Sequence, residues 1–174
     1  MSFEEQLVAG LEGTVVVMGI GNPMRGDDGA GSLAARGVLE RPGVRVLDAR
    51  DVPEEHVVEV VSQRPDTIIL IDCVEMNAEP GSVAFLESEQ IGEYWPSTHR
   101  MPMSVLMRVL SQETQTRVVG IGIQPAHTEF LKPMSTAVAE SAVDLARLLN
   151  DALARGRKAA QVVAAGCPER EVPA

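Results

Sequence analysis

Short runs of β-branched and other apolar residues alternate along this chain with segments of helical character. The runs predict strands over residues 14–21, 43–50, 66–74, 81–87 and 116–124. Continuous apolar runs are typical of strands buried on both faces, as in a parallel sheet. Helices are predicted between and after them, over residues 29–40, 53–64, 103–113 and 135–156. This alternation favours an α/β fold, a three-layer αβα sandwich with a mainly parallel sheet.

A chain of 174 residues favours a single domain, which we expect over residues 1–160, followed by a flexible tail over 161–174. The strand at 81–87 is expected to lie antiparallel at an edge, because only a short turn precedes it. The acidic N-terminus does not read as a signal peptide, and no apolar run approaches the roughly 18–20 residues of a membrane span. We therefore expect a cytoplasmic protein without membrane insertion.

Composition narrows the possible partners and sites. The formal net charge is −10, which argues against binding to nucleic acid, because affinity for phosphate backbones comes from clustered Lys and Arg. The two cysteines, Cys73 and Cys167, form no C-x-x-C pair, so neither a disulfide framework nor a cysteine-rich zinc site is supported. Cys73 lies within an apolar run and is expected to be a core residue.

The segment GIGNPMRGDDGAG, residues 19–31, follows the first predicted strand. It has the glycine spacing of a phosphate-binding loop but not the residues that end one. Asp27 and Asp28 stand where such a loop needs Lys and Ser or Thr. Two carboxylates would repel a phosphate. A dinucleotide fingerprint also fails, because Met24 stands where its third glycine would be. The turn thus favours approach of a cation, and an α/β nucleotide-binding protein is the weaker option.

Further polar residues follow other predicted strands. Asp72 ends the third strand, Gln124 closes the fifth, and His99 lies in the loop before the third helix. In an α/β fold these loops meet Asp27 and Asp28 at one edge of the sheet. Each residue alone has a structural explanation, and one of the two adjacent acids is expected to cap the following helix. Together, carboxylates, imidazole and amide suit a divalent cation.

Three segments together resemble the endopeptidases that mature nickel–iron hydrogenases. GIGNPMRGDDGAG is similar to that family's G-x-G-N-x-x-x-x-D-[DE]-G-x-G segment, STHRMPMSVL to the segment around its metal-binding histidine, and GIGIQP followed by LKPMS to its fifth-strand region. The likeness is strongest to the branch serving the large subunits of formate-hydrogenlyase-type hydrogenases. The resemblance implies a twisted five-stranded sheet between helices.

The resemblance also implies an activity, the removal of a C-terminal extension from the [NiFe]-hydrogenase large-subunit precursor after nickel insertion. It implies an endopeptidase of aspartic type, with Asp28, Asp72 and His99 as catalytic and metal-contacting residues and Asp27 as a helix cap that supports them. Nickel, supplied by the precursor, is the expected metal, and no organic cofactor is expected. A non-catalytic nickel-binding assembly chaperone using the same cleft is the alternative. Neither an H-E-x-x-H helix nor a G-x-S-x-G elbow is present.

Overall fold

A five-stranded sheet forms the centre of the computed structural model, which describes residues 2–11, 13–86 and 101–165. The strand order is β2-β1-β3-β5-β4. The strands are β1 (Val15–Ile20), β2 (Val44–Arg50), β3 (Thr67–Cys73), β4 (Val83–Leu86) and β5 (Arg117–Ile123). The first three and β5 run parallel, while β4 pairs antiparallel with β5 at the edge. Both the mainly parallel sheet and the antiparallel edge strand are therefore confirmed.

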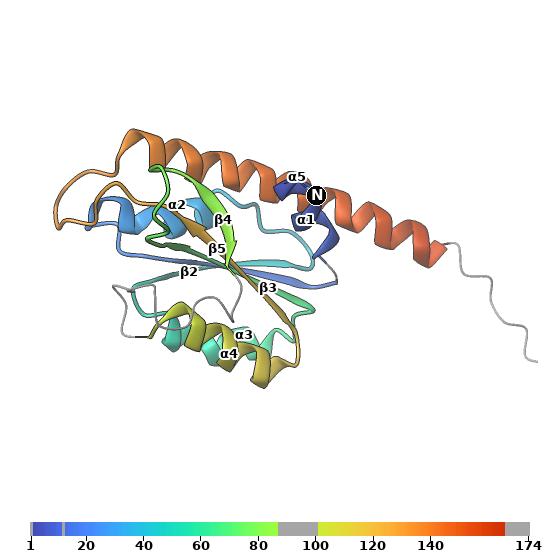
Figure 1. The fold of residues 1–174 in the computed structure, drawn as a ribbon. Coiled ribbons are helices and arrows are strands. Elements are labelled where there is room, and N and C mark those ends of the chain that lie inside the picture. Colours follow the sequence, from blue (N-terminus) through green and yellow to red (C-terminus); the bar gives the residue numbers. More distant parts are fainter. Residues whose placement is uncertain (1, 12, 87–100, 166–174) are drawn as a thin grey trace, which may run out of the picture.

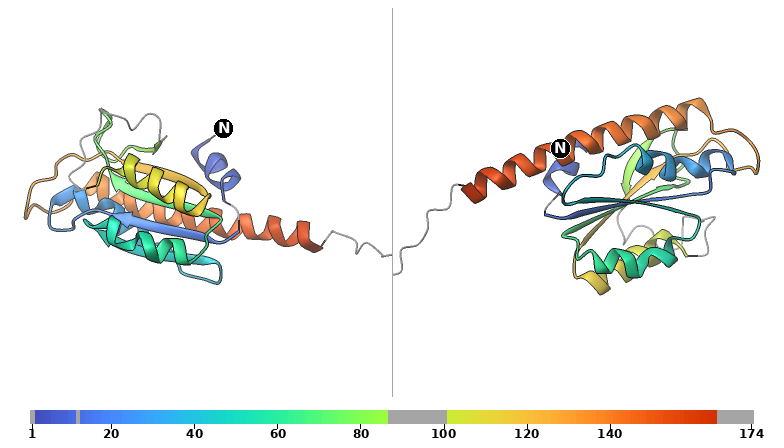
Figure 2. Two further views of the ribbon diagram at one scale, coloured as in Figure 1. Left: turned by 90° about the horizontal axis from the view of Figure 1, so that it is seen from below. Right: turned by 180° about the vertical axis from the view of Figure 1, so that it is seen from behind.

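Helices cover both faces of this sheet, as Figures 1 and 2 show. On one face lie α1 (Phe3–Ala9), α2 (Ala30–Arg36) and α5 (Thr136–Ala165), and on the other α3 (Val57–Ser62) and α4 (Met103–Thr114). Two 3-10 turns, η1 (Gly26–Gly29) and η2 (Pro53–His56), lead into α2 and α3. The three-layer prediction is confirmed. Helix α5 runs past the residue-160 limit expected for the domain, and those domain bounds stay a prediction.

The side chains of the central strands alternate between two core layers. Val17 and Ile69 pack in the layer beneath α1, α2 and α5. Their neighbours Val16 and Ile68 pack in the layer beneath α3 and α4. All four are 0% exposed. Because successive side chains of a strand point to opposite faces, a sheet covered on both sides needs apolar residues at every position, which explains the continuous apolar runs.

Helix α1 is an element that the apolar pattern does not predict. The Ser2 hydroxyl accepts a hydrogen bond from the Glu5 N–H at 3.2 Å, and the Glu5 carboxylate accepts one from the Ser2 N–H at 2.7 Å. This reciprocal pair is a capping box, whose S-x-x-E signature is visible in the sequence. The helix is held in place by the Phe3 ring, which stacks on Phe85 of β4 with centroids 4.2 Å apart.

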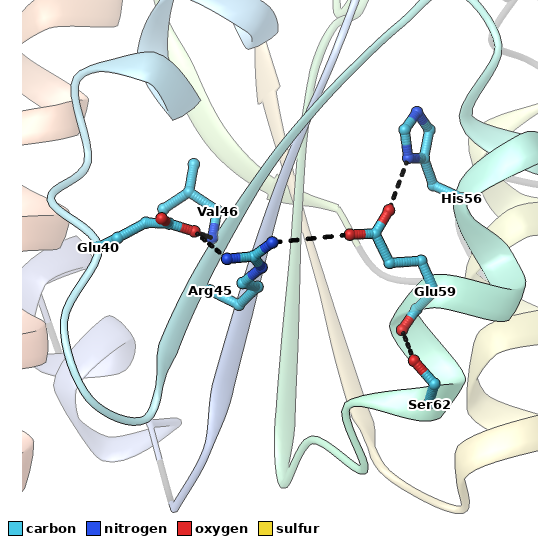
Figure 3. Close-up of polar contacts among 6 residues, drawn as sticks. All are labelled: Glu40, Arg45, Val46, His56, Glu59 and Ser62. Carbon is cyan, nitrogen blue, oxygen red and sulfur yellow. Dashed lines mark hydrogen bonds and ion pairs between the residues drawn. The ribbon is translucent and has the colours of Figure 1, made fainter.

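His56 takes part in a polar network between β2 and α3, drawn in Figure 3. Its Nδ1 lies 3.3 Å from the Glu59 carboxylate, which also faces the Arg45 guanidinium at 3.9 Å. Arg45 in turn pairs with Glu40 at 3.2 Å. All four side chains are partly exposed. The network connects the outer strand of the sheet to the helix beside it. It gives His56 a structural role that needs no bound ligand.

The start of α2 lies directly on the ends of β1 and β3, at Gly31. A Cβ built there would lie 2.2 Å from the Ile71 carbonyl oxygen and 2.3 Å from that of Ile20. We expect Gly31→Ala to lower the free energy of unfolding by about 2 kcal/mol, because α2 must move off the strands. Urea unfolding followed by circular dichroism measures this change.

The matched control is Gly156→Ala, inside α5, where the nearest atom would lie 3.6 Å from the added Cβ. Alanine favours helix over glycine by up to about 1 kcal/mol, so this variant should be as stable as the wild type or more so. If Gly31→Ala were as stable as Gly156→Ala, the close contact of α2 with the strand ends would not matter for stability.

Candidate functional site

The carboxyl ends of β1 and β3 form the topological switch point of the sheet. From β1 the chain passes through α2 to β2 on one side, and from β2 it returns through α3, on the opposite face, to β3 on the other side of β1. The connections therefore diverge at these strand ends, which is where α/β sheets bind ligands. Asp28 follows β1 in η1, and Asp72 is next to last in β3. Both are candidate residues.

Gly21 allows the turn after β1 to fold back tightly. Its φ is +134°, which side-chain-bearing residues rarely adopt, and a Cβ there would lie 1.8 Å from the Asp28 carbonyl oxygen. The backbone of η1 thus lies on the end of β1, and η1 also contacts β3. The glycines of this turn therefore place carboxylates at the strand ends, where a phosphate-binding loop would place groups that bind phosphate.

Asp27 is fully buried at 0% exposure and joins two distant loops. Its carboxylate accepts hydrogen bonds from the N–H groups of Ala126 at 2.8 Å, His127 at 3.2 Å and Ser135 at 2.6 Å, and from the Ser135 hydroxyl at 3.0 Å. The Asp27 N–H donates to the His127 carbonyl oxygen at 3.1 Å. The β1–α2 turn is therefore fastened to the loop between β5 and α5.

The prediction that an adjacent acid caps the following helix is wrong. Neither η1 nor α2 has a side-chain cap, and Gly29 stands at the N-cap of α2. Burial opposes ionisation of Asp27, but the N–H groups of Ser135, Ala126 and His127, with the Ser135 hydroxyl, outweigh it and hold the pKa of this carboxyl below its ordinary value. Asp27 is thus a charged brace between loops.

Asp28 is 1% exposed, and its Oδ2 accepts a hydrogen bond from the Asn22 N–H at 2.9 Å. The Asn22 side chain binds the turn at two further points: its Oδ1 accepts from the Met24 N–H at 2.9 Å, and its Nδ2 donates to Asp51 at 3.2 Å. Sequence reasoning did not single out Asn22. The signal for it is an Asx residue directly after a tight glycine turn, where its side chain can bond the backbone two residues on.

Asp72 is 3% exposed, and its Oδ1 accepts a hydrogen bond from the Cys73 N–H at 2.7 Å. A carboxylate this deeply buried in a central strand is uncommon in proteins unless it is paired or has a function. Its side chain and that of Cys73 point to opposite faces of the sheet, because successive residues in a strand alternate.

The pKa of the Cys73 thiol is raised by its surroundings at this edge of the sheet. Burial raises the pKa of the thiol, and the negative charges of Asp72, Asp28, Asp27 and Glu75 raise it further, in that order. These carboxylates belong to the segments at the carboxyl ends of β1 and β3. Cys73 is partly exposed rather than fully buried, and it remains a neutral thiol, which is not a nucleophile.

His99 lies in the segment 87–100, outside the described residues, so the third expected ligand is not placed. Within the part of the chain that the structure describes, no group of three or more His, Cys, Asp or Glu side chains is arranged to hold a metal ion. Asp28 and Asp72 supply two carboxylates, which nickel tolerates beside imidazole. The three-residue site stays a prediction.

Gln124 braces the loop after β3 and is 3% exposed. Its Oε1 accepts from the N–H groups of Met76 at 2.6 Å and Ala78 at 3.3 Å. Its Nε2 donates to Glu75 at 2.8 Å and to the Pro125 carbonyl oxygen at 3.0 Å. With both ends of its amide engaged in these hydrogen bonds, Gln124 holds the loop after β3 in place.

None of the described helices is long and apolar enough to cross a membrane. Residues 32–153 match the family HycI, hydrogenase maturation protease. This span begins after Asp28 and includes Asp72. The hydrogenase 3 maturation protease of Escherichia coli K12 is 31% identical over 131 residues, which is 74% of this chain and 83% of that protein.

Solved structures agree with the sequence match. A crystal structure of a [NiFe] hydrogenase maturation protease HycI from Thermococcus kodakarensis KOD1 has a TM-score of 0.80 at 29% identity, covering 88% of this chain and 99% of that chain. The solution structure of an endopeptidase HycI from Escherichia coli has a TM-score of 0.70 at 30% identity, covering 79% and 90%. The fold expected from the resemblance is thereby confirmed.

Proposed function

The chain belongs to the hydrogenase maturation protease family, and from this premise we propose that it removes the C-terminal extension of a nickel-loaded [NiFe]-hydrogenase large-subunit precursor. The observation that carries the proposal is the placement of two buried carboxylates, Asp28 and Asp72, at the carboxyl ends of neighbouring parallel strands. The enzyme is accordingly a hydrolase of peptide bonds, and its client is the precursor rather than a small molecule.

Recognition of the metal follows from charge. Two buried carboxylates at one edge of the sheet would favour a divalent cation near both, because the cation offsets their like charges. Asp28 and Asp72, with His99, would occupy open positions on the nickel held by the precursor, for which imidazole is well suited and carboxylate acceptable. A precursor without nickel offers no such contact, so the enzyme would distinguish loaded from empty precursor and hold the scissile bond in place only in the loaded one.

Hydrolysis then needs an activated water. Asp28 or Asp72 would accept the proton of the water as it attacks the scissile carbonyl, the role that an aspartic-type classification implies. The nickel of the precursor would supply polarisation of the carbonyl or of the water. The neutral Cys73 thiol is not the nucleophile, because burial and the surrounding carboxylates hold its proton in place. The cytoplasmic location expected from the sequence stays a prediction.

Incubation of the enzyme with nickel-loaded and nickel-free precursor tests the proposal. We expect the large subunit to become shorter only when nickel is present, with a rate at least about 100-fold above that for the empty precursor, because the metal contact positions the bond. Mass measurement of the large subunit gives the result. Empty precursor reloaded with nickel is the control that excludes damage during metal removal.

Two results would count against this function. Equal shortening of loaded and empty precursor would remove metal recognition from the proposal. Tight binding of the loaded precursor without any change in its mass would favour the alternative, a non-catalytic nickel-binding assembly chaperone that uses the same residues.

A further inference from the structure

An exposed apolar patch lies on two loops beside the carboxylates. Met24 is 54% exposed, Phe130 58% and Leu131 70%. Pro23 and Pro133, next to them in the chain, are exposed as well. Single exposed apolar side chains are ordinary, whereas a group of them gathered from separate chain segments marks an interaction site. These five residues are called the loop patch below.

Hydrogen bonds join the loop patch to Asp28. The Asp28 carboxylate accepts from the Asn22 N–H at 2.9 Å, and the Asn22 Oδ1 accepts from the Met24 N–H at 2.9 Å. The Met24 carbonyl oxygen then accepts from the Leu131 N–H at 2.7 Å. Three short bonds thus lead from a candidate catalytic carboxylate to the middle of the patch. The position of the patch relative to Asp28 is therefore fixed by the fold.

Leu131 has a backbone conformation that leucine rarely adopts. Its φ is +62°, in the left-handed region that favours glycine and asparagine. The bond from its N–H to Met24 holds this conformation, and the side chain is 70% exposed to solvent. Folding gains nothing from an apolar side chain held in water on a strained backbone. Such strain, when observed, points to a role in binding.

Resting on the proposed function, we propose that the loop patch binds bulky apolar side chains of the large-subunit precursor beside the scissile bond. The bonds to Asp28 make the patch continuous with the reacting centre. The patch itself carries no charge, and the neighbouring Glu129 and Lys132 pair with each other. In a chain of net charge −10, this uncharged surface suits a segment with aliphatic or aromatic residues rather than a basic one.

The double variant Met24→Gln, Leu131→Asn tests this inference. Glutamine keeps the length of methionine, and asparagine tolerates the left-handed backbone, so the fold should be preserved. We expect the KM for nickel-loaded precursor to rise about tenfold or more, with kcat within about twofold of wild type, because binding contacts are lost but the carboxylates are not. Binding of Cd²⁺ alone to the enzyme should be unchanged. If circular dichroism shows the double variant unfolded, Leu131→Asn alone is measured.

Leu39→Gln and Val58→Gln are the matched controls, since these apolar residues are 66% and 80% exposed but lie elsewhere in the chain, Leu39 between α2 and β2 and Val58 in α3. Neither should change KM. An unchanged KM in the double variant, with normal processing by the wild type, would overturn the inference and leave the function standing. A wild type that does not shorten loaded precursor would overturn both. A wild-type dimer that dissociates in the double variant at unchanged KM would assign the patch to self-association and overturn the inference.

Discussion

Asp72→Asn is expected to lower kcat/KM for nickel-loaded precursor by about 10³-fold while the protein stays folded. Asparagine keeps the volume of Asp72 and an oxygen that can accept the hydrogen bond from the Cys73 N–H, now 2.7 Å from Oδ1. It removes the negative charge that would contact nickel or accept a proton from water. Asp28→Asn should have a loss of similar size for the same reason. Mass measurement of the large subunit over time gives the rates.

A matched control for this prediction is Asp48→Asn. Asp48 lies on β2, accepts a hydrogen bond from the Ser32 hydroxyl at 2.6 Å and lies 3.8 Å from the Arg36 guanidinium. The chemical change is the same, but this carboxylate is outside the proposed site, so processing should be within about twofold of wild type. Wild-type rates for Asp72→Asn would exclude Asp72 from catalysis and from metal recognition.

Asp27→Ala should have the largest effect on stability, lowering the free energy of unfolding by about 4 kcal/mol at pH 7. The reason is that three backbone N–H groups, those of Ala126, His127 and Ser135, lose a charged acceptor that is itself fully buried. For a chain of this size the melting temperature would fall by roughly 10 °C. Asp27→Asn keeps one acceptor oxygen and should lie between alanine and wild type.

The contribution of Asp27 should also depend on pH. Its pKa in the folded state is depressed, below the roughly 3.9 expected for the unfolded chain. Its stabilisation is therefore fully present above the unfolded-state value and is lost as the pH falls toward the folded-state value. Urea unfolding of wild type and Asp27→Asn at pH 7, 5, 4 and 3 measures the difference. A difference that stays constant down to pH 3 would show that the charge of Asp27 is not what stabilises the fold.

Sequence reasoning predicted the strands well, because a sheet covered on both faces leaves an unbroken apolar run at each strand. It predicted the edge placement of β4 from the length of one turn. It did not find α1, since seven residues from Phe3 to Ala9 are too few for a helical period to be evident. The capping box at Ser2 and Glu5 was the available signal.

The contacts at the candidate site were predicted less completely, because they join residues that are far apart in the chain. That Asp28 and Asp72 lie at one edge of the sheet follows from strand order alone, while their role as site residues stays a prediction. The role of Asp27 does not follow from strand order, because its partner Ser135 lies 108 positions away in the chain and no local pattern reports on it. A nearby helix made capping the natural inference, but the intervening turn η1 directs the carboxylate elsewhere.

The hydrogen bonds between the β1–α2 turn and the β5–α5 loop have a consequence for grafting loops from a relative. Asp27 holds one end of the later loop at Ala126 and the other at Ser135, and Met24 holds its middle at Leu131. The two segments thus form one structural unit. A graft from a relative that transferred residues 126–135 alone would lose the residues that hold this loop. Residues 21–28 therefore have to be transferred with it.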